Sequence, residues 1–150
     1  MQVNGEFKLK APRQTVWDML NDPEVLAASI PGVDRFVSEG QDRYRAEMSV
    51  GIGMIRGKFG GTVEVKDKLE PERYRMLVEG KGPGGWLKGD GLLNLNETGA
   101  EATTVSVVGD ATVGGLLARV GQRMIGNASN SLMKQFFSNL EKEIRRRQKA

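Results

Sequence analysis

Residues 114–147, GGLLARVGQRMIGNASNSLMKQFFSNLEKEIRRR, have the periodicity of one long amphipathic helix. At about 1.5 Å per residue, such a helix is roughly 45–50 Å long and can cross a small domain. Its predicted inward stripe is bulky at both ends and small in the middle, and consists of Leu117, Gly121, Met124, Ala128, Leu132, Phe136, Leu140 and Ile144. A helix that lacks bulk at its centre leaves space beneath it, so this stretch predicts a ligand cavity.

The chain before this helix mostly alternates between apolar and polar residues, which is typical of strands. Strands are expected at residues 2–10, 33–38, 43–50, 54–69, 73–81, 86–96 and 102–112. Pro12 and Asp22-Pro23 predict two short helices after the first strand, with Asp22 as the N-cap of the second. Hairpin-sized loops make the sheet antiparallel, and interior glycines indicate curvature. The sequence therefore predicts an α+β, helix-grip fold with residues 1–150 as a single domain.

The chain contains no cysteine and no histidine, which excludes disulfides and thiolate sites and makes a metal site unexpected. The acid–base candidates are Asp, Glu, Lys, Tyr44 and Tyr74. Asp90 could be a partly buried carboxylate, although a solvent-facing strand position is the simpler interpretation. Arg119 and Arg123 are expected to face solvent in the same way. No nucleophile–base pair is visible, so no catalytic residue is predicted.

Positive charge gathers at the end of the chain, where residues 114–150 carry eight Lys or Arg against two Glu. We expect Arg145, Arg146, Arg147 and Lys149 to meet an anionic membrane or an acidic partner, or simply to favour the helix dipole and solubility. Nucleic-acid binding is not expected, since these cations are not interleaved with aromatic residues. Without an apolar run of 18 residues or a signal peptide, we expect a cytoplasmic protein, peripheral to the inner face of the membrane at most.

Methionines and aromatic residues predict the walls of the cavity, although methionine is also an ordinary core residue. The candidate lining comprises Trp17, Leu26, Ile30, Met48, Met54, Phe59, Met76, Trp86, Gly121, Met124, Ala128 and Phe136. A gate is expected at Pro31-Gly32 and at Gly84-Gly85, where an ordinary hairpin loop is the alternative. The glycines from Gly51 to Gly61 are attributed to sheet bending, because no phosphate-binding pattern surrounds them.

An ordered series of short motifs runs through nearly the whole chain: Val16-Trp17, Leu20-Asn21-Asp22-Pro23-Glu24-Val25-Leu26, Ile30-Pro31-Gly32, residues 56–61, residues 79–82, Lys88-Gly89, residues 113–121 and Gln135-Phe136-Phe137. In this series the chain resembles the carbon monoxide dehydrogenase G-subunit family, within the START-like, polyketide-cyclase-like SRPBCC superfamily. The resemblance implies a helix-grip fold with an internal apolar pocket. It also implies association with a CO-oxidising molybdenum hydroxylase and a link to the membrane quinone pool.

Three functions remain open at this point. The first is a carrier for a hydrophobic planar molecule such as menaquinone or ubiquinone, serving a molybdenum hydroxylase such as CO dehydrogenase. The second is an adaptor that recruits the dehydrogenase to the membrane without a ligand role. The third is a cyclase or hydrolase acting on a polyketide-like substrate.

Overall fold

The computed structural model describes residues 1–52 and 54–148, which form one curved antiparallel sheet and four helices. In chain order the elements are β1 (Gln2–Leu9), α1 (Arg13–Leu20), α2 (Pro23–Ser29), β2 (Val33–Ser38), β3 (Arg43–Ile52), β4 (Ile55–Leu69), β5 (Arg73–Gly82), β6 (Gly85–Gly99), β7 (Ala102–Gly115), α3 (Leu117–Val120) and α4 (Gln122–Gln148). The α+β helix-grip architecture expected from the sequence is confirmed.

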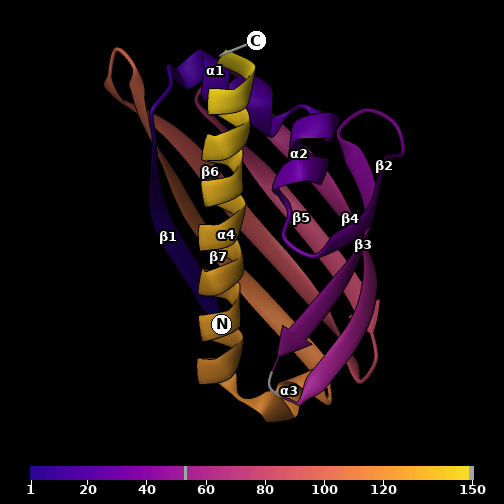
Figure 1. Ribbon diagram of the computed structural model, residues 1–150. Coiled ribbons are helices and arrows are strands. Elements are labelled where there is room, and N and C mark those ends of the chain that lie inside the picture. Colours follow the sequence, from indigo (N-terminus) through magenta and orange to yellow (C-terminus); the bar gives the residue numbers. More distant parts are fainter. Residues whose placement is uncertain (53, 149–150) are drawn as a thin grey trace.

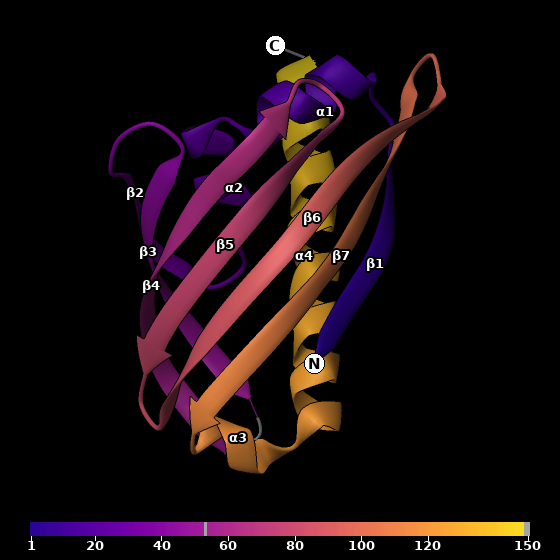
Figure 2. The same cartoon turned by 180° about the vertical axis from the view of Figure 1, so that it is seen from behind.

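The sheet has the strand order β1-β7-β6-β5-β4-β3-β2, so the first strand returns to pair with the last. Helix α4 runs along the inner face of the sheet, whereas the outer face is formed by strands (Figures 1 and 2). Helices α1 and α2 lie at the end where α4 finishes, and α3 lies at the opposite end (Figure 1). We call these the upper and lower ends of the molecule, as drawn in Figure 1.

The prediction of one continuous helix from residue 114 was wrong. Strand β7 continues to Gly115, the short α3 follows, and Gly121 separates α3 from α4 with φ +96°. Glycine adopts this backbone conformation readily, whereas residues with a Cβ rarely do, so the chain can turn sharply here. The break also changes which residues face inward: Ile125 is buried, and Met124 is 44% exposed.

The apolar interior consists of two separate groups of buried residues. The upper core includes Trp17 against Tyr74, and Phe7 stacked on Phe137 with ring centroids 4.3 Å apart. Leu140 and Ile144 of α4 belong to this core. The lower cluster is smaller: its buried members are Phe59, Leu117 and Ile125. The space between the two groups positions the candidate site.

Polar contacts fix α2 to the upper half of α4. Asp22 caps α2 as predicted, because its Oδ1 accepts a hydrogen bond from the Glu24 backbone N–H at 2.9 Å. The Asn139 side-chain amide donates to the Ser29 carbonyl oxygen at 3.0 Å. Arg147 lies 3.7 Å from Asp22 Oδ2 and 3.8 Å from Glu24 Oε2. The lower half of α4 begins instead at the Gly121 break.

Candidate functional site

An apolar cavity of about 270 Å³ lies between the sheet and the lower half of α4. Strands β3 to β7 form one wall with residues that include Met48, Phe59 and Val78. Leu117 of α3 and Leu132 of α4 contribute to the opposite side. The polar residues that border it are Thr62, Glu79 and Ser129. The chemistry of this wall suits a ligand that is mainly apolar.

The cavity exists because small residues face each other across the two layers. On the sheet side they are Ala46, Gly61 and Gly80, and on α4 they are Ala128 and Ser129. At Gly61 the strands approach so closely that a Cβ would meet the backbone of Glu79. The lack of bulk at the centre of the helix, inferred from sequence, thus coincides with small residues on the opposing strands, and neither layer fills the space.

The structure distributes the predicted lining residues over several places. Met48, Phe59 and Ala128 lie on the cavity wall. Trp17, Met76 and Phe136 belong to the upper core instead. Leu26 and Ile30 are half-buried around the end of α2, away from the wall. Gly121 borders a neighbouring hollow of about 270 Å³ between α3, α4 and the end of β7.

For three residues the prediction that they line the cavity was wrong, because their side chains are exposed. Met54 is 99% exposed in the turn before β4, and Met124 is exposed because the helix break rotates it outward. Trp86 is 39% exposed and lies on the outer face of the sheet. Successive strand residues point to opposite faces, so Leu87, not Trp86, borders the inner cavity.

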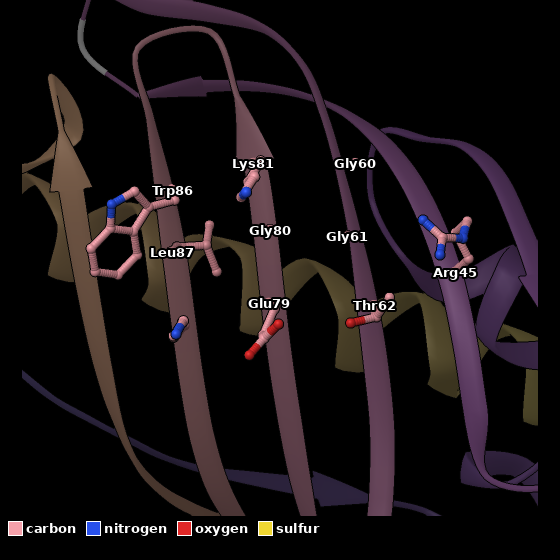
Figure 3. A pocket seen from close by; sticks show the side chains of 10 residues that line it. Arg45, Gly60, Gly61, Thr62, Glu79, Gly80, Lys81, Trp86 and Leu87 are labelled. Carbon is pink, nitrogen blue, oxygen red and sulfur yellow. The ribbon is translucent and has the colours of Figure 1, made fainter.

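Trp86 belongs to a separate, shallow hollow of about 430 Å³ on the outer face. Figure 3 shows Trp86, Lys81, Glu79, Thr62 and Arg45 on neighbouring strands around Gly60 and Gly61, with α4 behind the sheet. The Trp86 ring packs over Gly114, where a Cβ would collide with the ring. The rim of the hollow carries both signs of charge, which distinguishes it from the apolar inner cavity.

The two predicted gate segments differ in how they relate to the cavity. Pro31 and Gly32 line a hollow of about 320 Å³ that shares Val50, Ala128 and Leu132 with the cavity. Gly32 is held in a tight turn, with φ +70° and its carbonyl accepting from the Ser49 N–H at 2.8 Å.

Gly84 and Gly85 form the turn between β5 and β6 at the lower end. The Gly84 carbonyl accepts from the Leu117 N–H at 3.1 Å, so this turn holds α3 against the sheet. Whether either gate segment moves stays a prediction.

The basic end of α4 lies far from the cavity. Arg146 pairs with Glu143 at 2.7 Å, and Arg147 contacts Asp22 and Glu24, while Lys149 lies outside the described residues. Arg145 borders a groove between α4 and β1. At about 1.5 Å per residue, Arg145 lies roughly 20 Å beyond Leu132 along the helix. The basic end is thus well separated from the cavity, and its contact with an acidic partner or an anionic membrane stays a prediction.

Glu79 borders the cavity, whereas Tyr44, Tyr74 and Asp90 lie outside its lining. Burial, with a smaller contribution from Asp42, raises the pKa of Tyr44. Burial also raises the pKa of Tyr74 well above its usual range, because the ring lies in the upper core. Asp90 is exposed and pairs with Arg75 at 2.8 Å, and Arg119 is exposed as expected. Within residues 1–52 and 54–148, no three acidic side chains come together in a way that could hold a metal ion.

The sequence profile of the carbon monoxide dehydrogenase G-subunit (CoxG) family matches residues 5–145. The chain belongs to this family. No curated protein sequence matches it significantly. A conserved protein from Geobacillus kaustophilus has a similar structure, with a TM-score of 0.92 and 34% identity over 97% of this chain and 96% of that one.

Two more distant structures show the same fold. A START superfamily protein from Mycobacterium smegmatis has a TM-score of 0.77 and 14% identity, with 97% of each chain covered. The Zhui aromatase/cyclase from Streptomyces sp. R1128 has a TM-score of 0.72 and 15% identity over 98% of this chain and 94% of that one. The CoxG family and the START-like fold favour a ligand-binding or carrier role, although the aromatase/cyclase proves that this fold also houses enzymes.

No described helix of this CoxG family member combines the length and the apolar character needed to span a membrane.

Proposed function

We propose that this protein binds and carries a hydrophobic planar molecule, and that its cargo is a membrane quinone. The observation that carries the proposal is the apolar cavity between the sheet and the lower half of α4, bordered by Met48, Phe59 and Leu132. Flat and flexible apolar side chains of this kind accommodate a planar ring without demanding one exact shape.

The dimensions of the site favour a ring with a tail that extends beyond the cavity. Ligand pockets usually measure about 300 to 1,000 Å³, so a cavity of about 270 Å³ suits the ring of a quinone better than a whole lipid. The hollow beside Pro31-Gly32 shares part of the cavity wall and offers a path for an isoprenoid tail. Burying 300 Å² of apolar ligand surface would contribute roughly 7 kcal/mol before the costs of binding.

Membership of the CoxG family supports the choice of partner. A CO-dehydrogenase-type molybdenum hydroxylase releases electrons that a quinone can accept, and menaquinone and ubiquinone dissolve in the bilayer. A carrier would move the quinone between the membrane and the dehydrogenase. It takes the oxidised quinone from the membrane, presents it to the dehydrogenase and returns the reduced form. The electron transfer itself takes place on the dehydrogenase.

The composition of the cavity wall supports a carrier over a cyclase or hydrolase. Its polar residues are Thr62, Glu79 and Ser129, and Glu79 has an exposed side chain. The two tyrosines lie outside the lining, and the exposed Asp90 lies outside it as well. A cyclase would need positioned acid–base groups at its substrate.

The test is to extract freshly purified protein with organic solvent and to measure quinone by mass spectrometry and ultraviolet absorbance. We expect near-stoichiometric quinone, at least tenfold less in Ala128→Leu, which fills the cavity, and an unchanged amount in Asn130→Leu. Asn130 is exposed on the same helix and provides a matched control. An empty wild-type extract, together with no thermal shift on adding quinone, would refute the carrier role and favour the adaptor.

A further inference from the structure

Besides the basic end of α4, a second group of cations lies at the lower end of the molecule, in three segments far apart in the sequence. These are residues 50–52 and 54–59 at the adjoining ends of β3 and β4, residues 80–87 around the turn between β5 and β6, and residues 112–126 around α3. Together they contain Arg56, Lys58, Lys81, Arg119 and Arg123 but no Asp or Glu. Figures 1 and 2 show that the three segments meet at the same end of the sheet.

These five cations are all exposed, and their pairing differs from that of several cations towards the upper end. Within the described part of the chain, none of the five takes part in an ion pair, whereas Arg13, Arg43, Lys68 and Arg147 all do. Carboxylates do lie on the adjoining strands, but within the described residues none forms an ion pair with these cations: Glu79 is two residues before Lys81, and Asp34 accepts a hydrogen bond from Ser49, which lies opposite Lys58. The lower end therefore presents charge that the protein itself leaves uncompensated.

Exposed apolar side chains occur at the same end. Met54 is 99% exposed in the turn before β4, Leu116 is 51% exposed beside α3, and Met124 is 44% exposed on the first turn of α4. Trp86 is 39% exposed on the adjoining part of the outer face. Proteins that lie on anionic membranes typically expose apolar residues surrounded by cations. Methionine or leucine then enters the interface, and Lys or Arg contacts the lipid head groups.

We propose that this lower end docks on an anionic lipid bilayer. We call it the docking end, and it consists of Met54, Leu116, Met124 and the five cations named above. The inference rests on the proposed function, because a quinone carrier must meet the membrane that supplies its cargo.

The position of the cavity explains why this end, and not the basic tail, faces the bilayer. Leu116 and Met124 are exposed, while their chain neighbours Leu117 and Ile125 border the cavity. Docking through α3 therefore brings the cavity wall next to the lipid, so a ligand travels only a short way from one apolar phase to the other. The Gly121 break, at φ +96°, lies between these two pairs and allows them to separate.

An acidic protein surface is the alternative occupant, and two observations favour lipid. The apolar side chains lie at a turn and at helix ends that come from separate segments, rather than on one flat patch. Met54 in particular is almost completely exposed, as suits a residue that inserts into a fluid phase.

The experiment measures binding to quinone-free vesicles of phosphatidylcholine with and without phosphatidylglycerol, at low and high salt. We expect binding only to the anionic vesicles and its loss at high salt. Each cation near an anionic surface contributes about fivefold, so Arg119→Gln with Arg123→Gln should weaken binding roughly 25-fold. The matched control, Lys142→Gln with Arg145→Gln, removes two cations from the upper end and should bind almost as wild type.

Insertion has its own readout, because Trp86 lies on the outer face beside the docking end and the other tryptophan, Trp17, is only 3% exposed. Vesicles with brominated acyl chains should quench Trp86 fluorescence, and Trp86→Phe should remove the quenched component. Met54→Ser with Leu116→Ser should reduce quenching, whereas Leu69→Ser at the opposite end should not.

The docking proposal is overturned if wild type ignores anionic vesicles at low salt, or if the upper-end control loses binding as much as the lower-end variant. If wild type does not bind anionic vesicles, an acidic protein becomes the expected partner of this surface. Because the vesicles contain no quinone, an empty solvent extract with intact vesicle binding refutes the carrier and leaves the docking end standing.

Discussion

The upper and lower halves of this molecule are built differently from the same sheet and the same helix. In the upper half Leu140, Ile144 and Val16 are at most 1% exposed, and several cations, Arg147 among them, are paired with carboxylates. In the lower half small residues leave a cavity under α4, and the cations lack partners within the described residues. The comparison teaches that one half provides stability, which frees the other half for binding.

The largest expected effect is on the free energy of unfolding when the upper core is truncated. Leu140→Ala removes a side chain that is 0% exposed and should destabilise the protein by about 3–4 kcal/mol. Leu132→Ala removes a half-buried side chain that already faces empty space and should cost less than about 1.5 kcal/mol. Urea unfolding of both variants measures the difference, and equal losses would contradict the division into two halves.

The opposite change, adding bulk, sharpens the same contrast. Ala11 is 0% exposed in the upper core, so Ala11→Leu should overpack it and cost about 1–3 kcal/mol. Ala128→Leu extends into the cavity and should change the stability of the ligand-free protein by less than about 1 kcal/mol. Thermal unfolding after removal of ligand tests this pair; strong destabilisation by Ala128→Leu would mean that the cavity collapses in solution.

The contacts that hold α2 to the upper half of α4 should have smaller effects. Asp22→Ala removes the N-cap of α2 and an ion-pair partner of Arg147, and should cost about 1 kcal/mol. Arg147→Gln alone should cost less than about 1 kcal/mol, because its partners are partly exposed. Repeating the measurement at high salt separates the two, since the cap persists whereas the ion pair is screened.

The smallest effect at neutral pH is expected for Tyr74→Phe. Burial raises the pKa of Tyr74 in the folded protein, so the folded state holds this proton more tightly than the unfolded state. The resulting stability is complete below the ordinary tyrosine pKa of about 10 and is lost as pH rises above it. The variant should therefore lose less stability than wild type between neutral pH and pH 11, as chemical unfolding at both values would reveal.

The strands were predictable from sequence, because alternation of apolar and polar residues reports which face is buried. The helix break was missed because apolar spacing continues across Gly121, and only a glycine after Val120 hinted at it. Trp86 was assigned to the cavity because aromatic side chains commonly line ligand pockets. In the strand it is the next residue, Leu87, that faces inward. The docking end could not be found, since its cations become neighbours only through the topology of the sheet.

Because of the break at Gly121, we expect the two parts of α4 to be unequally protected from hydrogen exchange. Amides near Phe137 and Leu140 lie over the upper core, so their exchange requires opening much of the domain. The first turn of α4 lies between a glycine with positive φ and a cavity, and its amides can exchange through a local fluctuation that leaves the rest folded. If the protein is a carrier as proposed, we expect its ligand to exchange on the timescale of this local fraying, while the lifetime of the folded protein is set separately by the upper core.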